Sequence, residues 1–576
     1  MNQGASVFHG STTRQLRRCC ALGALLLVGA ITRLPAQGAG PSRSPRLVVL
    51  ITVDQVTPDY VDRYGPELTG GLGRLLNGGA VYTNAFQDQA NTETAPGHAS
   101  LLSGRFPRST GIVSNGLGVP DPQAPLIGGG GPGASPFRFR GGTLMDWLRM
   151  KDPCARALSV SRKDRGAILP LGRARQDVYW YASDGRFTTS RYYADTLPAW
   201  VERFNARRVP QRSAGRAWAL LRPASAYPEP DSVPIESGGR DFVFPHYQSA
   251  DTAQAVRDFI AFPWMDELTA DLALAGLNEL QLGRGPSTDI LAVSFSSTDA
   301  IGHRFGYESR EIHDQILRLD RTLGLFIDSL YKLRDSSTVA IALTADHGVT
   351  PTPELVQART HVPAYRVDLS DLVRAYRSAL ARQGLDSTAF VFQDAMLFVD
   401  RQAFARAHLN ADSVICAFRA GARRRPGVLR ADAPASLARA DTLRDPVARR
   451  WLHALPPDLP VALLVTLAPN SVWGSYATGI HGGPSDHDAH VPLIFYGPMF
   501  RTGRHPEFAR VVDIAPTLAR VMNVTPAEIL DGHVLTSALG TGEDAPRPAQ
   551  RPCSLRAPVA PGRADRARMA RTVSQH

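Results

Sequence analysis

The stretch RLVVLITVD at residues 46–54 is a nearly continuous apolar run that ends in a carboxylate, Asp54. Such a run predicts a strand buried on both faces, as in the interior of a parallel sheet. Three later runs share this design, namely DILAVSFS at 289–296, TVAIALT at 338–344 and VPLIFY at 491–496. Ligands of open α/β sheets gather at the carboxyl ends of the strands. The polar residues that follow these runs are therefore candidates for a functional site.

Helical patterns lie between the strands. In residues 309–334, apolar side chains recur at spacings of three and four, at Ile312, Ile316, Leu319, Leu323 and Ile327. This alternation predicts an α/β fold with a central, mostly parallel sheet. Two ranges, at about 109–250 and about 361–478, interrupt it. We interpret both as insertions that cap the carboxyl edge of the sheet, within one catalytic domain at residues 46–540.

The first 36 residues have the order of a secretory signal. Arg14, Arg17 and Arg18 precede an apolar run at 21–31, and small residues follow near Ala36. The run is shorter than the ~20 residues that a membrane span needs, and no later segment approaches that length. We expect export to the periplasm or the medium, with an uncleaved N-terminal tether as the alternative. The Pro/Arg-rich tail at 541–576 has no apolar period and is expected to be disordered.

The net charge of +11 is concentrated at the two ends of the chain. Residues 1–36 hold four Arg and no acidic residue, and residues 541–576 hold seven Arg against three acidic residues, which leaves +3 for residues 37–540. A nearly neutral body implies no general nucleic-acid groove.

Three cysteines follow the predicted signal, Cys154, Cys416 and Cys553. Their wide spacing fits neither a disulfide framework nor a metal knuckle. One pair could form a disulfide in an oxidising compartment, and the sequence does not choose the pair.

Carboxylates and imidazoles follow the predicted strands. Asp54 ends the first, Asp299 and His303 follow the second with the spacing of one helical turn, and Asp346 and His347 follow the third. A buried carboxylate is costly without a partner, and a cation is one such partner. Zinc binds Asp and His, and a catalytic zinc keeps one position open for substrate.

Thr94 stands in the segment NTETAPGHAS at residues 91–100. It precedes Ala95 and Pro96, so we expect it to be the N-cap of a helix that Gly104 closes. Capping alone would explain the residue. A threonine hydroxyl becomes a nucleophile only when a base or a cation lowers its pKa, and both a helix N-terminus and a nearby metal favour the alkoxide.

Together these motifs, in this order over residues 46–535, resemble the alkaline phosphatase superfamily. The resemblance implies a three-layer sandwich and two zinc ions. One zinc would be held by Asp299, His303 and His481, and the other by Asp54, Asp346, His347 and Thr94. His481 is preferred to His487 and His490 because it lies in a His-Gly turn ahead of the last strand.

The segment SRKDRGAILP at residues 161–170 resembles PafA-like alkaline phosphatases in particular. This resemblance implies that Lys163, Arg165 and Asn115 contact the phosphate, in place of the third, magnesium site of other alkaline phosphatases. Aromatic residues follow in the same range, and they could line a leaving-group pocket or belong to the core of the cap (Tyr179, Trp180 and Tyr192).

The resulting hypothesis is a phosphate monoester hydrolase that acts on small-molecule phosphate esters through a phosphothreonine at Thr94. A phosphodiesterase or nucleotide pyrophosphatase on the same core is the nearest alternative. A non-catalytic, metal-stabilised binding protein is a further alternative. A sulfatase is disfavoured because no Cys/Ser-x-Pro-x-Arg segment replaces the Thr94 motif.

Overall fold

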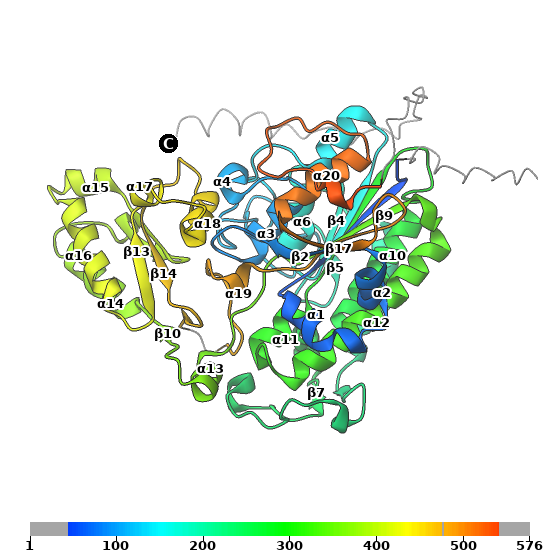
Figure 1. Cartoon of the computed structure of the whole chain (residues 1–576), viewed down its shortest axis with the longest axis horizontal. Coiled ribbons are helices and arrows are strands. Elements are labelled where there is room, and N and C mark those ends of the chain that lie inside the picture. Colours follow the sequence, from blue (N-terminus) through cyan, green and yellow to red (C-terminus); the bar gives the residue numbers. More distant parts are fainter. Residues whose placement is uncertain (1–43, 475–476, 541–576) are drawn as a thin grey trace, which may run out of the picture.

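The computed structural model describes residues 44–474 and 477–540. Its centre is a nine-stranded sheet in the order β17-β2-β16-β9-β1-β8-β3-β4-β5 (Figure 1). The strands are β1 (Leu47–Val53), β2 (Ala80–Phe86), β3 (Ala157–Ser161), β4 (Asp177–Tyr181), β5 (Phe187–Thr188), β8 (Asp289–Phe295), β9 (Val339–Thr344), β16 (Leu493–Tyr496) and β17 (Gly503–Arg510). The predicted signal at 1–36 and the tail at 541–576 lie outside the described residues.

The sheet is mostly parallel, as predicted. Strand β1 pairs in parallel with both β8 and β9, and all of its residues are buried. Strands β3 and β4 continue the parallel arrangement beyond β8, and β17 is parallel to β2. Only β16 and the short edge strand β5 run antiparallel to their neighbours in this sheet.

Helices cover both faces of the sheet, which confirms the three-layer architecture (Figure 1). One face carries α2 (Gly71–Gly78), α10 (Trp264–Glu279) and α12 (Arg310–Leu333), and the other carries α3 (Thr94–Leu101), α5 (Leu144–Lys151), α6 (Asp164–Ile168) and α20 (Ile514–Val521). Helix α12 is the helix predicted at 309–334. Ser309 caps it by accepting a hydrogen bond from the Ile312 amide at 3.1 Å.

The remaining elements of this body are short. They are α1 (Pro58–Tyr64), α4 (Pro107–Thr110), α7 (Ala199–Asn205), α8 (Val209–Arg212), α9 (Thr252–Asp258), α11 (Ser297–Phe305), α13 (Pro353–Thr360) and α19 (Asp486–Ala489), with the two-stranded pair β6 (Ala217–Trp218) and β7 (His246–Tyr247).

The range 109–250 is not a separate cap, so the first predicted insertion needs correction. It contributes β3, β4 and β5 to the central sheet, together with α6, which packs on β3 and β4. These strands have five residues or fewer, and long Gly/Pro-rich loops separate them from the regular strand-helix alternation. Strands this short give too few apolar repeats to be distinguished, in the sequence, from the Gly/Pro-rich loops around them.

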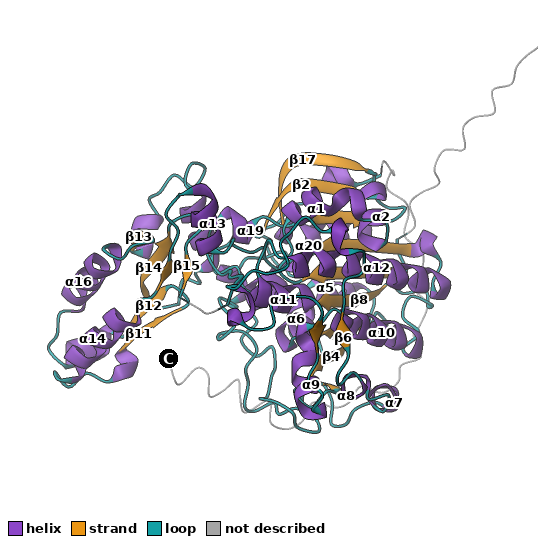
Figure 2. Cartoon of the chain, turned by 90° about the horizontal axis from the view of Figure 1, so that it is seen from below, coloured by secondary structure: helices purple, strands orange, loops and turns teal. Residues whose placement is uncertain are grey.

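The range 361–478 forms a second lobe, defined here as residues 366–473, beside the catalytic body (Figures 1 and 2). Its antiparallel sheet has the order β11-β12-β14-β13, and a short parallel pair, β10 and β15, adjoins it. The elements are β10 (Arg366–Val367), α14 (Ser370–Ala381), β11 (Phe390–Gln393), β12 (Met396–Val399), α15 (Arg401–Arg406), α16 (Ala411–Arg423), β13 (Val428–Asp432), α17 (Pro434–Leu437), α18 (Pro446–Ala454), β14 (Val461–Leu467) and β15 (Val472–Trp473). Phe390, Leu397, Phe404 and Phe418 are buried in its own hydrophobic core.

Helix α18 joins the second lobe to loops of the catalytic body. Arg449 forms an ion pair with the buried Asp88 at 2.9 Å. Arg450 is almost fully buried; its backbone oxygen accepts from the Ala90 amide at 2.9 Å, and its guanidinium donates to the Pro484 carbonyl at 2.8 Å. One helix therefore holds both the loop that precedes Thr94 and the loop that follows His481.

Cys154 is disulfide-bonded, whereas Cys416 is an exposed free thiol. Cys553 lies outside the described residues. Across residues 44–474 and 477–540, no helix combines the length and the apolar character that crossing a membrane requires.

Candidate active site

The candidate residues meet because three neighbouring strands end side by side. In the register of the sheet, Val53 of β1 lies opposite Phe295 of β8, and Thr52 lies opposite Thr344 of β9. The chain therefore leaves all three strands at the same edge. Asp54 follows β1, Asp299 lies in the first turn of α11 after β8, and Asp346 and His347 follow β9.

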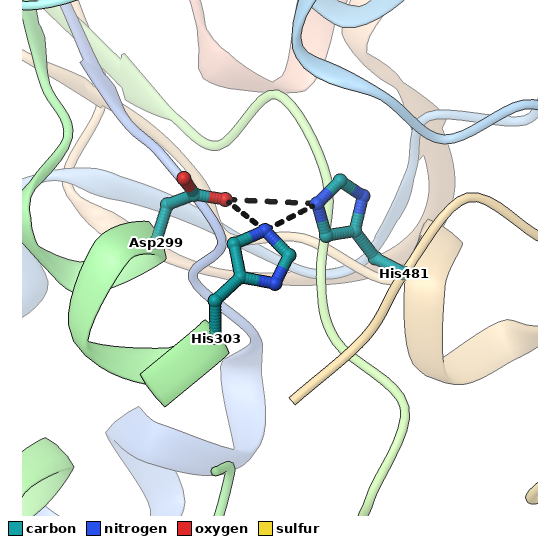
Figure 3. A group of neighbouring side chains, drawn as sticks. All are labelled: Asp299, His303 and His481. Atoms are coloured by element: carbon teal, nitrogen blue, oxygen red, sulfur yellow. Dashed lines mark hydrogen bonds and ion pairs between the residues drawn. The ribbon is translucent and has the colours of Figure 1, made fainter. Parts of the chain in front are cut away.

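Asp299, His303 and His481 form one cluster (Figure 3). Helix α11 presents Asp299 and His303 one turn apart, with His303 Nε2 at 3.2 Å from Asp299 Oδ1. His481 Nε2 lies 3.6 Å from the same oxygen and 3.2 Å from His303 Nε2. His487 and His490 are not part of the cluster; His490 instead stacks on Phe86.

The backbone determines which nitrogen of each imidazole carries the proton. His303 Nδ1 donates to the Gly479 carbonyl at 2.7 Å, and His481 Nδ1 donates to the Thr92 carbonyl at 2.8 Å. A carbonyl only accepts, so in the neutral rings both Nε2 atoms carry lone pairs. Two lone pairs and a carboxylate oxygen thus point at one another. A cation between them satisfies all three, which is the arrangement expected of a metal site.

Asp54, Asp299 and His347 form a second cluster that shares Asp299 with the first. His347 Nε2 lies 3.3 Å from Asp54 Oδ1 and 3.7 Å from Asp346 Oδ2. The His347 ring stacks on the His481 ring with centroids 3.6 Å apart, so the clusters are adjacent.

Several buried acceptors in the second cluster, and in Asp346 beside it, form no hydrogen bond among the described residues. They are both carboxylate oxygens of Asp54, Oδ2 of Asp346 and Nε2 of His347. Lys163 and His98 contact Asp54 Oδ2 and Asp346 Oδ2, at 2.6 and 3.2 Å. Three buried carboxylates nevertheless converge here, those of Asp54, Asp299 and Asp346, and their desolvation favours a bound cation. His347 Nδ1 is directed at the Gly348 carbonyl at 2.9 Å, which leaves Nε2 free to bind a cation. The donor set therefore fits a second metal ion.

Lys163 lies between the two clusters and Thr94. Its Nζ is 2.6 Å from Asp54 Oδ2, 2.8 Å from Asp299 Oδ2 and 2.9 Å from Thr94 Oγ1. Burial raises the pKa of Asp54 and of Asp299, but Lys163 and the neighbouring imidazoles outweigh it and hold the pKa of each carboxyl well below its usual value. Both carboxylates are thus kept ionised and ready to bind a cation.

Thr94 is the first residue of α3 and not its N-cap, which corrects the expectation from the sequence. Glu93 takes the cap position, with extended backbone angles of φ −119° and ψ 163°. The reason is that the chain already turns into the helix at Thr94, ahead of Pro96. Thr94 is almost completely buried, and its hydroxyl faces Lys163 at the N-terminus of the helix, where the helix dipole favours negative charge.

A cavity of about 600 Å³ opens in front of Thr94. Its wall contains the residues predicted to hold phosphate and those of the first cluster, namely Asn115, Lys163, Arg165, Asp299, His303 and His481. Asn115 Oδ1 accepts from the Ala95 amide at 2.9 Å, which fixes the side chain beside Thr94. Trp180 also lines the cavity, whereas Tyr179 and Tyr192 are absent from its wall.

Comparison with known proteins identifies the family. Residues 48–374, more than half of the chain, match the family described as type I phosphodiesterase / nucleotide pyrophosphatase. The chain belongs to this family.

Relatives that match over most of their length show to which part of this family the chain belongs. Alkaline phosphatase PhoV of Synechococcus elongatus is 30% identical over 525 residues, which are 86% of this chain and 93% of the relative. Alkaline phosphatase PhoK of a Sphingomonas species is 29% identical, covering 86% and 92%. The crystal structure of wild type alkaline phosphatase PafA superposes with a TM-score of 0.80 at 27% identity, covering 86% and 99%. Within the family, the chain groups with the PafA-like alkaline phosphatases and is a hydrolase.

Some residues of this phosphodiesterase-family site were not assigned a role from the sequence. His98, one turn after Thr94 on α3, contacts Asp346 Oδ2 at 3.2 Å, and Gln55 Nε2 donates to Asp299 Oδ1 at 3.2 Å. Arg162 Nη2 lies 3.4 Å from Asp299 Oδ2. The four-residue spacing from Thr94 was a usable signal for His98. Gln55 and Arg162 only adjoin assigned residues in the sequence, which does not reveal where they point.

Proposed function

We propose that this hydrolase cleaves phosphate monoesters as an alkaline phosphatase, and that Thr94 takes the phosphoryl group at a site with two zinc ions. The observation that supports this most is the position of Lys163 Nζ, which joins the Thr94 hydroxyl to Asp54 and Asp299. Asp299 belongs to both clusters. A nucleophile, a phosphate-binding cation and the two candidate metal sites are thus in direct contact.

Asp299, His303 and His481 would hold one zinc, and Asp54, Asp346, His347 and Thr94 the other. The mixture of carboxylate and imidazole ligands favours zinc over magnesium. Bound there, two such ions would stabilise the charge on the attacking and leaving oxygens of an in-line displacement.

The residues of the chain itself account for the remaining steps. The helix N-terminus and Lys163 stabilise the Thr94 alkoxide, which attacks phosphorus while the bond from phosphorus to the leaving alcohol breaks. The leaving alkoxide takes a proton from water. The hydroxide formed in this way then attacks the phosphothreonine, releases hydrogen phosphate and returns the Thr94 alkoxide for the next turnover. Each displacement inverts phosphorus, so the net result is retention.

Lys163, Arg165 and Asn115 favour a monoester over a diester. A monoester dianion carries one more negative charge than a diester, and it gains more from cations around its non-bridging oxygens. Lys offers a point charge, and Arg offers a fork that matches two oxygens. The family also suggests a phosphodiesterase or nucleotide pyrophosphatase as a second candidate. Comparing phenyl phosphate with a phenyl diester separates the two.

The nucleophile is tested with Thr94→Ala and with Thr94→Ser as the matched control that keeps a hydroxyl. We expect Thr94→Ala to lower kcat far more than tenfold while metal content is retained, and Thr94→Ser to keep measurable turnover. Activity of Thr94→Ala within about tenfold of wild type would contradict the assignment. Export to the periplasm or the medium is part of the same proposal and depends on residues 1–36 alone.

A further inference from the structure

A second cavity, of about 680 Å³, lies between the catalytic body and the second lobe. From the body it is lined by Glu93, His481 and Gly482, and the rest of its lining comes from the second lobe and the adjoining Gly474. His481 also lines the cavity in front of Thr94. One candidate metal ligand, His481, therefore lines both cavities, and Glu93 directly precedes the proposed nucleophile.

Part of the lining of this interlobe cavity is apolar and aromatic. Trp473 of β15 and Phe392 of β11 are both partly buried, with ring centroids 5.7 Å apart. Val367, Leu369 and Val373 add to this apolar part of the lining. Flat apolar surface of this kind binds a planar ring through dispersion and the hydrophobic effect.

The rest of the lining combines three carboxylates, which accept hydrogen bonds from within the chain, with two arginines. Glu93 Oε2 accepts from the Asn115 amide at 2.7 Å, Asp368 accepts from the Ser370 amide at 2.7 Å, and Asp394 accepts from the Gln393 side chain at 3.1 Å.

Arg374 and Arg377 are the two arginines of this lining. They lie three residues apart on α14, so both project from the same side of the helix, and both are exposed. Neither forms a hydrogen bond or an ion pair with another residue in the described part of the chain, and the charge of Arg377 interacts only at longer range with Asp386. Two guanidinium groups are thus available to an anion in the cavity.

We propose that the interlobe cavity binds the alcohol portion of the ester, and that it selects alcohols that combine an aromatic ring with a second negative charge. The ring would lie against Trp473, and the charge would meet Arg374 and Arg377. This inference rests on the proposed function, because the cavity selects substrates only if phosphoryl transfer takes place at Thr94. It also gives the second lobe a role in substrate choice.

The test compares three monoesters, phenyl phosphate, 2-naphthyl phosphate and 6-sulfo-2-naphthyl phosphate, through kcat/KM at low ionic strength. We expect the wild type to prefer the sulfonated ester to its unsubstituted parent, mainly through a lower KM. Partly exposed charge pairs are individually weak, so the double variant Arg374→Ala/Arg377→Ala should lower this preference by about fivefold. The esters differ in intrinsic reactivity, but this difference cancels when the ratio of kcat/KM for the sulfonated ester to that for its parent is compared between the wild type and the double variant.

Two further variants sharpen the result. Arg382→Ala removes an exposed arginine just beyond α14 that does not line the cavity, and it should keep the wild-type ratio. Trp473→Leu should lower kcat/KM for 2-naphthyl phosphate relative to phenyl phosphate. Equal ratios in the wild type and the double arginine variant would overturn the role of the arginines. A drop in both naphthyl esters with Trp180→Leu instead of Trp473→Leu would place the alcohol in the cavity at Thr94.

Failure of the proposed function gives a different result. If the wild type, loaded with metal, hydrolyses none of the three monoesters, the assignment of the monoester activity is wrong. If it hydrolyses all three with the same ratios in every variant, phosphoryl transfer stands and the interlobe cavity is not the alcohol site.

Discussion

Lys163→Met tests the electrostatic part of the site, because it keeps most of the apolar stem and removes the charge. In the structure, Nζ lies 2.9 Å from the Thr94 hydroxyl and within 2.8 Å of two buried carboxylates. Loss of a preorganised group that stabilises developing charge typically costs ~10²–10³ in kcat. We expect a loss of this size in kcat/KM for phenyl phosphate.

A diester should be affected less. Coulomb energy is proportional to charge, so a diester with one negative charge should lose about half as much free energy as a monoester dianion with two. The expected loss for the diester is therefore ~10–30-fold, and the preference for the monoester should fall by about the same factor.

The assay measures kcat/KM for phenyl phosphate and methyl phenyl phosphate, together with the metal content of each protein. Lys332→Ala, which removes an exposed lysine on α12, is the control for loss of a positive charge. Equal losses for both esters at full metal content would refute the assignment of Lys163 to the phosphate oxygens. If kcat/KM falls only in proportion to the metal content, Lys163 acts only as a structural partner of Asp54 and Asp299.

Three further predictions concern metal binding and stability. His98→Gln should lower metal affinity or activity by ~10–100-fold through the loss of the contact to Asp346, as measured by metal content and kcat. Chelation should abolish activity and lower Tm, and Zn²⁺ should restore both better than Mg²⁺; equal restoration by Mg²⁺ would contradict the zinc assignment. Burial, and then Glu311 and Asp231, raise the pKa of Glu236 to about 9, so folding takes up a proton at this group between the unfolded and folded pKa values. As the pH rises from 5 to 9, the free energy of unfolding of the wild type should therefore decrease. The decrease should be smaller in Glu236→Gln, and urea unfolding at several pH values would measure it.

The central part of the fold could be predicted because its signals are local. Strand β1 is a continuous apolar run, and its neighbours β8 and β9 repeat the pattern, so the meeting of Asp54, Asp299 and Asp346 follows from parallel pairing alone. Asp299 and His303 are four residues apart, so a helix over this segment is enough to predict that they lie on the same side. The edge of the sheet could not be predicted in the same way, because β3 and β4 are short and their order depends on packing against α10 and α6.

The contacts that give the site its chemistry are not local. Lys163 reaches Thr94 and Asp54 because β3 lies next to β8, and no feature of the segment at 161–170 reveals that neighbour. The phosphate-binding role predicted for Lys163 comes from the resemblance to PafA-like enzymes and not from its position in the sequence. Gly97 shows the same dependence, since a Cβ at this position would lie 2.2 Å from the Asp346 backbone oxygen. Only glycine allows α3 to approach the end of β9 so closely.

The most direct test of the central claim is to trap the phosphorylated enzyme. Metal-loaded wild type would be mixed with phenyl phosphate, quenched in acid during steady-state turnover, digested and examined by mass spectrometry for phosphorylated peptides. The proposed mechanism predicts phosphate on Thr94 in the wild type and on no residue in Thr94→Ala. Phosphate on another residue, or turnover without phosphate on Thr94, would contradict it.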